Sequence, residues 1–146
     1  MVRLSGKNVD EIRIRQRLRG GENPIMCETN FRVLLDKQLL AATKKEVAAK
    51  TKIIRQNKFL VIFGGTITDF KWVGGGIRHT LNQDTNLHTM ILDLVQDISE
   101  IRIKPEGKSA VTIRKRGPEG VVSLRGDEFE IYDRIAKHVR EIASTR

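Results

Sequence analysis

Two short segments place basic side chains at alternate positions, a spacing that suits contact with phosphate groups. Residues 12–17 read Ile-Arg-Ile-Arg-Gln-Arg, and residues 111–116 read Val-Thr-Ile-Arg-Lys-Arg. Side chains of a β-strand alternate between its two faces, so each segment predicts one apolar face and one basic face. Guanidinium and ammonium groups neutralise the phosphates of a polyanion. The pattern therefore predicts a basic sheet surface for a polyanionic partner.

The same alternation recurs in two further segments. Ile101 and Ile103 alternate with Arg102 and Lys104, and residues 121–125 read Val-Val-Ser-Leu-Arg. A solvated face that protects sheet edges is the alternative for any one strand, but four strands of the same polarity favour a binding face. The basic side chains that we expect on this face are Arg13, Arg15, Arg17, Arg102, Lys104, Arg114, Arg116 and Arg125.

The net charge supports the same class of partner. The chain has 146 residues with 27 Lys+Arg and 18 Asp+Glu, a formal net charge of +9. Residues 1–56 hold 13 basic and 6 acidic side chains, residues 57–97 hold 3 and 4, and residues 98–146 hold 11 and 8. The length predicts one domain over residues 1–146. The sequence has no membrane-length apolar run and no secretory signal at its start, so we expect an intracellular protein without a membrane span.

Catalytic and metal-binding patterns are weak in this sequence. Cys27 is the only cysteine, and the three histidines His79, His88 and His138 form no metal-binding motif. The Gly74-Gly75-Gly76 run lacks the spacing of a phosphate-binding loop, and predicts a mobile loop or a close approach of a ligand to the backbone. We therefore predict no enzymatic activity, no metal and no cofactor.

The apolar spacing predicts an α+β fold in which two amphipathic helices cover the apolar face of antiparallel sheet. One long helix is expected to begin at Thr29 or Asn30, because Phe31, Leu34 and Leu35 start a helical period that reaches the lysines near residue 52. The second helix is expected over residues 127–144. Residues 87–95 are ambiguous, and we favour a strand there.

The segment from Lys58 to Trp72 is the most strand-like of the chain, with a break at residues 64–65. By parity, Phe70 and Trp72 share a face with two threonines. An aromatic side chain on an accessible sheet stacks on unpaired bases. We therefore include Trp72 in the expected nucleic-acid-binding surface, while a core position is the alternative for both aromatics.

The two basic flanks are similar in order. In residues 9–56 and 99–146, an Arg-rich strand, a Gly/Pro turn and a second strand precede a helical pattern, and an internal duplication and chance are both consistent with this. Residues 99–144, with Val122-Ser123-Leu124 before an aromatic-bearing helix, resemble the positive-cofactor-four family of single-stranded-DNA-binding coactivators. Residues 9–42 are a weaker echo of the same pattern.

The Whirly and kinetoplastid guide-RNA-binding proteins, which are related to this family, carry two sheet-plus-helix repeats. The resemblance implies that Arg114, Arg116 and Arg125 contact backbone phosphates. Its kinetoplastid branch implies a mitochondrial RNA-annealing role and assembly into tetramers. The family places four strands before each helix, whereas the sequence predicts only two clear strands before its first helix.

Three classes of function are consistent with these patterns. The leading hypothesis is non-enzymatic binding of single-stranded DNA or RNA through the basic sheet face, by a chain that forms a homo- or hetero-oligomer. The alternative is a pleckstrin-homology-like module, a run of strands ending in one helix, that binds phosphoinositide headgroups or a protein partner. A third class is an assembly protein that binds nucleic acid only through bulk charge.

Overall fold

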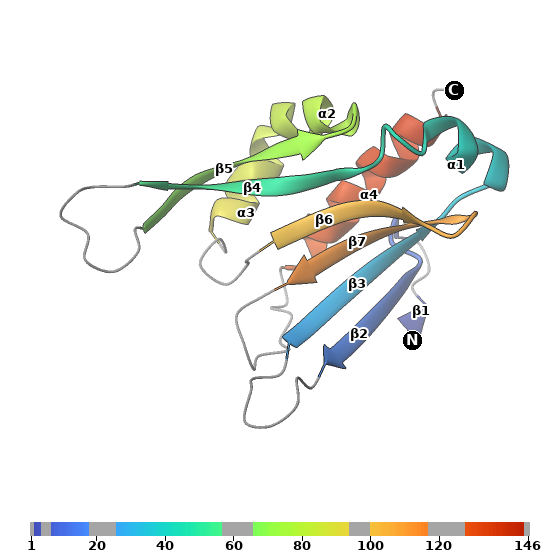
Figure 1. Cartoon of the computed structure of the whole chain (residues 1–146), viewed down its shortest axis with the longest axis horizontal. Coiled ribbons are helices and arrows are strands. Elements are labelled where there is room, and N and C mark those ends of the chain that lie inside the picture. Colours follow the sequence, from blue (N-terminus) through green and yellow to red (C-terminus); the bar gives the residue numbers. More distant parts are fainter. Residues whose placement is uncertain are drawn as a thin grey trace.

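Seven strands form one antiparallel sheet in the order β1-β2-β3-β7-β6-β4-β5 (Figure 1). The computed structural model describes residues 2–3, 7–17, 26–56, 66–93, 100–116 and 128–144. The strands are β1 (Val2–Arg3), β2 (Glu11–Arg17), β3 (Met26–Leu34), β4 (Ala49–Gln56), β5 (Thr66–Gly74), β6 (Glu100–Glu106) and β7 (Ala110–Arg116). Together with the helices, this sheet confirms the predicted α+β fold.

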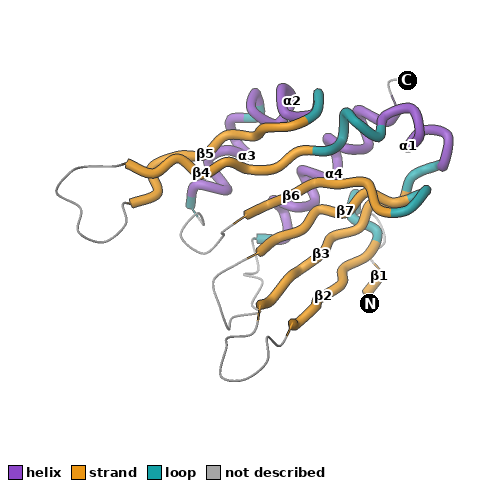
Figure 2. Tube along the Cα trace, in the orientation of Figure 1, coloured by secondary structure: helices purple, strands orange, loops and turns teal. Residues whose placement is uncertain are grey.

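Four helices complete the described part of the chain: α1 (Lys37–Thr43), α2 (Ile77–Gln83), α3 (Thr85–Leu92) and α4 (Phe129–Ser144). Helix α4 passes behind the central strands and contacts β3 and β7, while α2 packs on β5 (Figure 2). The ring of Tyr132 in α4 stacks on Phe31 of β3 at a centroid distance of 4.1 Å. The core therefore lies between the sheet and the helices, and we call the sheet surface that faces away from α4 the open face.

The helix expected from residue 29 onward is wrong, because residues 26–34 form β3. Phe31 and Val33 alternate into the core, and β3 is hydrogen-bonded to β2 on one side and to β7 on the other. Helix α1 begins only after Asp36, whose carboxylate accepts hydrogen bonds from the backbone N–H groups of residues 38 and 39. Pairing with two neighbouring strands therefore overrides the local helical spacing.

Other predicted elements have mixed outcomes. The strands expected around residues 12–17, 101–104 and 111–116 are confirmed as β2, β6 and β7, and α4 confirms the C-terminal helix. The strand favoured for residues 87–95 is wrong over its described part, since α3 covers it through Leu92 and places Leu87 and Ile91 in the core one turn apart. The strand expected at 121–125 and the break at 64–65 lie outside the described residues.

The glycine run at 74–76 packs against protein backbone. A Cβ atom on Gly74 would lie 2.5 Å from the carbonyl oxygen of Ala48, and one on Gly75 would lie 2.1 Å from that of Lys45. Gly75 also donates its N–H to the Ala48 oxygen at 2.6 Å. The expectation of a mobile loop is therefore wrong at these two positions, because the β5–α2 turn packs directly on the turn before β4. The alternative, a ligand that approaches the glycine backbone, stays a prediction.

The two similar flanks contribute different elements to the fold. Phe31 and Phe129 hold corresponding places in the two flanks, each near the start of the helical pattern that follows the second strand. Phe31 lies within strand β3, whereas Phe129 begins helix α4. The two corresponding aromatics therefore occupy different kinds of element.

Candidate nucleic-acid interface

A row of polar side chains crosses five adjacent strands on the open face. Arg13 of β2 is in register with Asn30 of β3, Asn30 with Arg114 of β7, Arg114 with Arg102 of β6, and Arg102 with Lys50 of β4. Neighbouring strands lie about 4.8 Å apart, so the row places a cation on four of five successive strands. We call these five residues the cation row.

One carboxylate serves two arginines of the cation row. Glu100 Oε1 lies 3.2 Å from Arg114 Nη2, and Glu100 Oε2 accepts a hydrogen bond from Arg102 Nη2 at 3.4 Å. Like charges directly opposite each other on a sheet are destabilising, and a shared acid offsets part of that repulsion. The Arg102–Arg114–Glu100 group retains a net positive charge.

Two further glutamates hold arginines beside the row. Arg116 donates two hydrogen bonds to Glu28 Oε1, at 2.9 Å from Nε and 2.7 Å from Nη2. Arg32 Nη1 donates to Glu11 Oε2 at 2.9 Å. Both glutamates are buried although they lie on the open face. These charge-assisted bonds fix the guanidinium planes.

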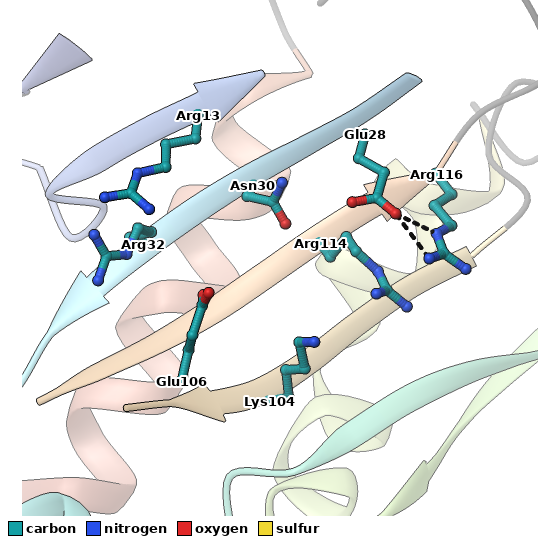
Figure 3. Close-up of a pocket in the computed structure, with 8 residues that line it drawn as sticks. All are labelled: Arg13, Glu28, Asn30, Arg32, Lys104, Glu106, Arg114 and Arg116. Carbon is teal, nitrogen blue, oxygen red and sulfur yellow. Dashed lines mark hydrogen bonds and ion pairs between the residues drawn. The ribbon is translucent and has the colours of Figure 1, made fainter. Parts of the chain in front are cut away.

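A polar hollow of about 170 Å³ opens between these side chains (Figure 3). Arg13 and Lys104 border it and form no ion pair with any other described residue. The Nε atoms of Arg32 and Arg114 are buried and have no hydrogen-bond partner in the described part of the chain. The side chains that line this arginine pocket are Arg13, Glu28, Asn30, Arg32, Lys104, Glu106, Arg114 and Arg116. With five cations and two carboxylates, the arginine pocket carries a net positive charge.

The structure brings together five of the residues expected at the interface. Arg13, Arg102, Lys104, Arg114 and Arg116 all lie on the open face of β2, β6 and β7.

For three of the expected arginines, the position of the side chain is not described. Arg15 and Arg17 belong to β2, but their side chains are not described, and Arg125 lies outside the described residues.

Trp72 is a core residue, so its expected stacking on a base is wrong. Its side chain is 2 % exposed and meets the ring of Phe70 edge-on at 6.4 Å between centroids. The side chain of Asn82 in α2 hydrogen-bonds both the backbone N–H and the carbonyl of Trp72. Helix α2 therefore covers the face of β5 that carries the two aromatics.

The interface expected from the sequence lacks Asn30, Arg32 and Lys50, because a helix is expected over the residues that contain them. The alternation of polar and apolar residues in 28–33, Glu-Thr-Asn-Phe-Arg-Val, indicates a strand and places Asn30 and Arg32 on the same face.

Lysines form a second basic area on β4 and β5. Lys52 is directly opposite Lys71, and Lys50 precedes them on the same face of β4. All three side chains are exposed, and none forms an ion pair with another described residue. We call Lys50, Lys52 and Lys71 the lysine patch; Lys50 also ends the cation row.

Asp84 lies at the centre of an ionic cluster with Arg134 and His138 on the helix side of the sheet. Burial opposes ionisation of its carboxyl, but hydrogen bonds from Arg134, His138 and the backbone of Leu87 hold its pKa well below the usual range. The same carboxylate raises the pKa of Arg134. Because Asp84 links the α2–α3 junction to α4, we assign this cluster to the architecture.

Lys115, Glu128 and Tyr132 form a buried cluster between β7 and α4. Glu128 is 3 % exposed, forms an ion pair with Lys115 and accepts a hydrogen bond from the Tyr132 hydroxyl at 2.8 Å. Burial and the neighbouring carboxylate raise the pKa of Tyr132 above its usual range. Lys115 thus points away from the open face although Arg114 and Arg116 flank it in sequence.

No family model matches the chain, and neither the curated proteins nor the solved structures contain a match to it. The resemblance to the positive-cofactor-four family therefore stays a prediction. Within the described ranges, no helix is long and apolar enough to cross a membrane. The same residues contain no group of three or more His, Cys, Asp or Glu side chains placed to hold a metal ion.

Proposed function

We propose that this chain binds single-stranded nucleic acid, DNA or RNA, across the open face of its sheet. The cation row is the observation that carries this proposal. A phosphodiester backbone that runs perpendicular to the strands meets a cation on four of the five strands of the row. Neutralisation of these phosphates releases counterions and supplies most of the affinity of sequence-independent binding.

The burial of Arg114 within the row supports a ligand role over simple solvation. The side chain of Arg114 is only 11 % exposed and faces Arg102 directly across the strands. Desolvation of like charges is unfavourable, and a bound phosphate offsets it with charge-assisted hydrogen bonds. The flanking glutamates orient the guanidinium planes before the ligand arrives, which lowers the entropic cost of binding.

The arrangement also fits a non-enzymatic role in annealing. Where the sheet holds the phosphates, most bases of the strand are left free to pair with a second strand. The pleckstrin-homology-like alternative expects a run of strands that ends in one helix. Here α1, α2 and α3 interrupt the strands before α4, and this order favours the nucleic-acid proposal.

Fluorescence anisotropy of a labelled oligonucleotide, measured over a range of salt concentrations, tests the proposal. The Arg13→Ala, Arg102→Ala and Arg114→Ala changes together are expected to lower the slope of log K against log salt by about 2, roughly 0.7 for each lost phosphate contact on a single strand. The matched control is Lys137→Ala, which removes an exposed cation from α4.

Equal affinity of the triple variant and the wild type would exclude the cation row as the binding site. Binding to phosphoinositide vesicles, with no binding to oligonucleotides, would instead support the headgroup alternative.

A further inference from the structure

A second hollow, of about 300 Å³, lies where β4 and β6 meet. Four of its lining residues, Lys50, Val73, Arg102 and Lys104, have the parity of the open face. The remaining lining residues are Ala48, Ala49, Gly74 and Ile103. The hollow therefore opens on the same surface as the cation row, on the opposite side of Arg102 from the arginine pocket.

Small residues create this hollow. Gly74 has a φ of +125°, and a Cβ atom there would collide with the backbone of Ala48 and Ala49. Ala48 adds only a methyl group, and the side chains of Ala49 and Ile103 are buried on the core face. The floor therefore consists of backbone and short apolar side chains. The β4–β6 ladder beneath it contains only two register pairs, Ala49 with Ile103 and Lys50 with Arg102.

The charges around the apolar floor all have one sign. Lys50, Arg102 and Lys104 surround it, and no carboxylate lines it, whereas two carboxylates line the arginine pocket. Lys50 and Arg102 also belong to the cation row, so a strand bound along the row passes the edge of the hollow. A ligand that fits this arrangement has an apolar, flat body and an anion on each side.

We propose that this hollow receives one unpaired base of the bound strand, while Lys50, Arg102 and Lys104 hold the flanking phosphates. This inference rests on the proposed function. No aromatic side chain of the described residues lies on the open face, since Phe31, Phe70, Trp72, Phe129 and Tyr132 pack on the helix side. The aliphatic floor is therefore an apolar surface beside the cation row that suits an unpaired base.

The test compares two oligonucleotides of equal charge. One is a thymidine strand of about 12 nucleotides, within the site sizes of sheet-based single-strand binders. The other is an abasic strand of the same length, which keeps every phosphate and lacks the bases. The wild type is expected to bind the thymidine strand about tenfold more tightly, because only this strand has a base whose apolar surface can be buried in the hollow.

Ala48→Leu fills the hollow without adding an aromatic ring or a charge. The variant is expected to lose the preference for the thymidine strand and to keep its affinity for the abasic strand. Ala41→Leu is the matched control, because it makes the same change at an exposed position of α1. Val73→Met is a second filling variant if Ala48→Leu does not fold, as judged by circular dichroism.

Two results would overturn the base assignment and leave the proposed function intact. One is equal wild-type affinity for the two strands, which would assign the hollow to another occupant such as an apolar side chain of a protein partner. The other is an unchanged preference in the filled variants. Failure of the wild type to bind either strand would instead contradict the proposed function itself.

Discussion

The two halves of the sheet carry positive charge in different ways. Strands β2, β3, β7 and β6, backed by α4, present arginines that are largely held by glutamates. Strands β4 and β5, backed by α2, present the lysine patch, which has no acidic partner among the described residues. Both halves are basic, but only the arginine half organises its charges internally.

Under the proposed function, this difference predicts a division of roles. A guanidinium fork held by a carboxylate is positioned for bidentate contact with phosphate, so we expect the arginine half to determine the path of a bound strand. Lysine is a flexible point charge, so we expect the lysine patch to add affinity with little geometric selectivity. Net charge alone does not distinguish the two halves.

Among the described residues, the two halves contact each other both within the sheet and between the helices. In the sheet, two β4–β6 register pairs are extended by Thr51, whose hydroxyl accepts a hydrogen bond from the Ile101 N–H at 3.0 Å. Among the helices, Arg134 of α4 donates to both carboxylate oxygens of Asp84, at 2.6 and 2.9 Å. The following changes address each half and the connection between them.

The largest effect is expected from Lys115→Ala. Lys115 belongs to the arginine half but lies on its helix side, so the change tests a structural charge and leaves the open face intact. This change removes the ion pair between Lys115 and the buried carboxylate of Glu128. It is expected to lower the free energy of unfolding by about 3 kcal/mol. Urea denaturation measures this. Lys104→Ala, an exposed neighbour on β6 without an ion pair, is the control, with an expected change within about 0.5 kcal/mol. Equal losses in the two variants would contradict this structural role.

The connection between the halves is tested by Asp84→Asn. The side chain of Asp84 is 6 % exposed and accepts charge-assisted hydrogen bonds. The change is therefore expected to lower the free energy of unfolding by about 2 kcal/mol at neutral pH.

The acid dependence of this loss follows from the direction of the pKa shift. The pKa of Asp84 is lowered in the folded state. Its stabilisation is therefore complete above the unfolded-state pKa of about 3.9 and is lost progressively as the pH falls from there towards the lowered folded-state pKa. The difference in the free energy of unfolding between the two proteins should therefore begin to shrink below about pH 4 and continue to shrink at lower pH. A constant difference down to pH 2 would exclude Asp84 as the titrating group.

The lysine patch is tested by the double change Lys52→Ala and Lys71→Ala. If each lysine contacts a phosphate, the slope of log K against log salt falls by about 1.4. Because two directly opposed like charges are removed, the free energy of unfolding is expected to rise by about 0.2–1 kcal/mol. The control pair is Lys37→Ala and Lys137→Ala, both exposed on helices. A loss of stability in the patch variant, with unchanged binding, would give the lysines a structural role.

The smallest effect is expected from Glu100→Gln. Removal of one negative charge beside Arg102 and Arg114 leaves both arginines more available to phosphate, and affinity is expected to rise about threefold, or roughly 0.7 kcal/mol. The same anisotropy titration measures it, with Glu141→Gln on the exposed side of α4 as the control. Weaker binding would mean that Glu100 is needed to position the arginines.

Local patterns predicted the elements that depend on local spacing. The alternation of Arg and Ile in β2 and β6 and the helical period of α4 each identified its element. Strand β3 was not predicted, because Phe31, Leu34 and Leu35 also fit a helical period. The interactions that decide its conformation are the hydrogen bonds to β2 and β7. Lys50 was placed in the same expected helix. The burial of Trp72 depends on the packing of α2, which no local pattern indicates.

The pairing of β3 with β7 also affects how the chain reaches its native state. Phe31 and Ile113 are register partners although more than half of the chain separates them, whereas β4 and β5 are neighbours in sequence. Contacts between distant residues form slowly, because a long loop must close before they become favourable. During synthesis, β4 and β5 can pair while β3 still lacks β7 as its second neighbour. The arginine half is therefore completed only when the C-terminal third of the chain has emerged.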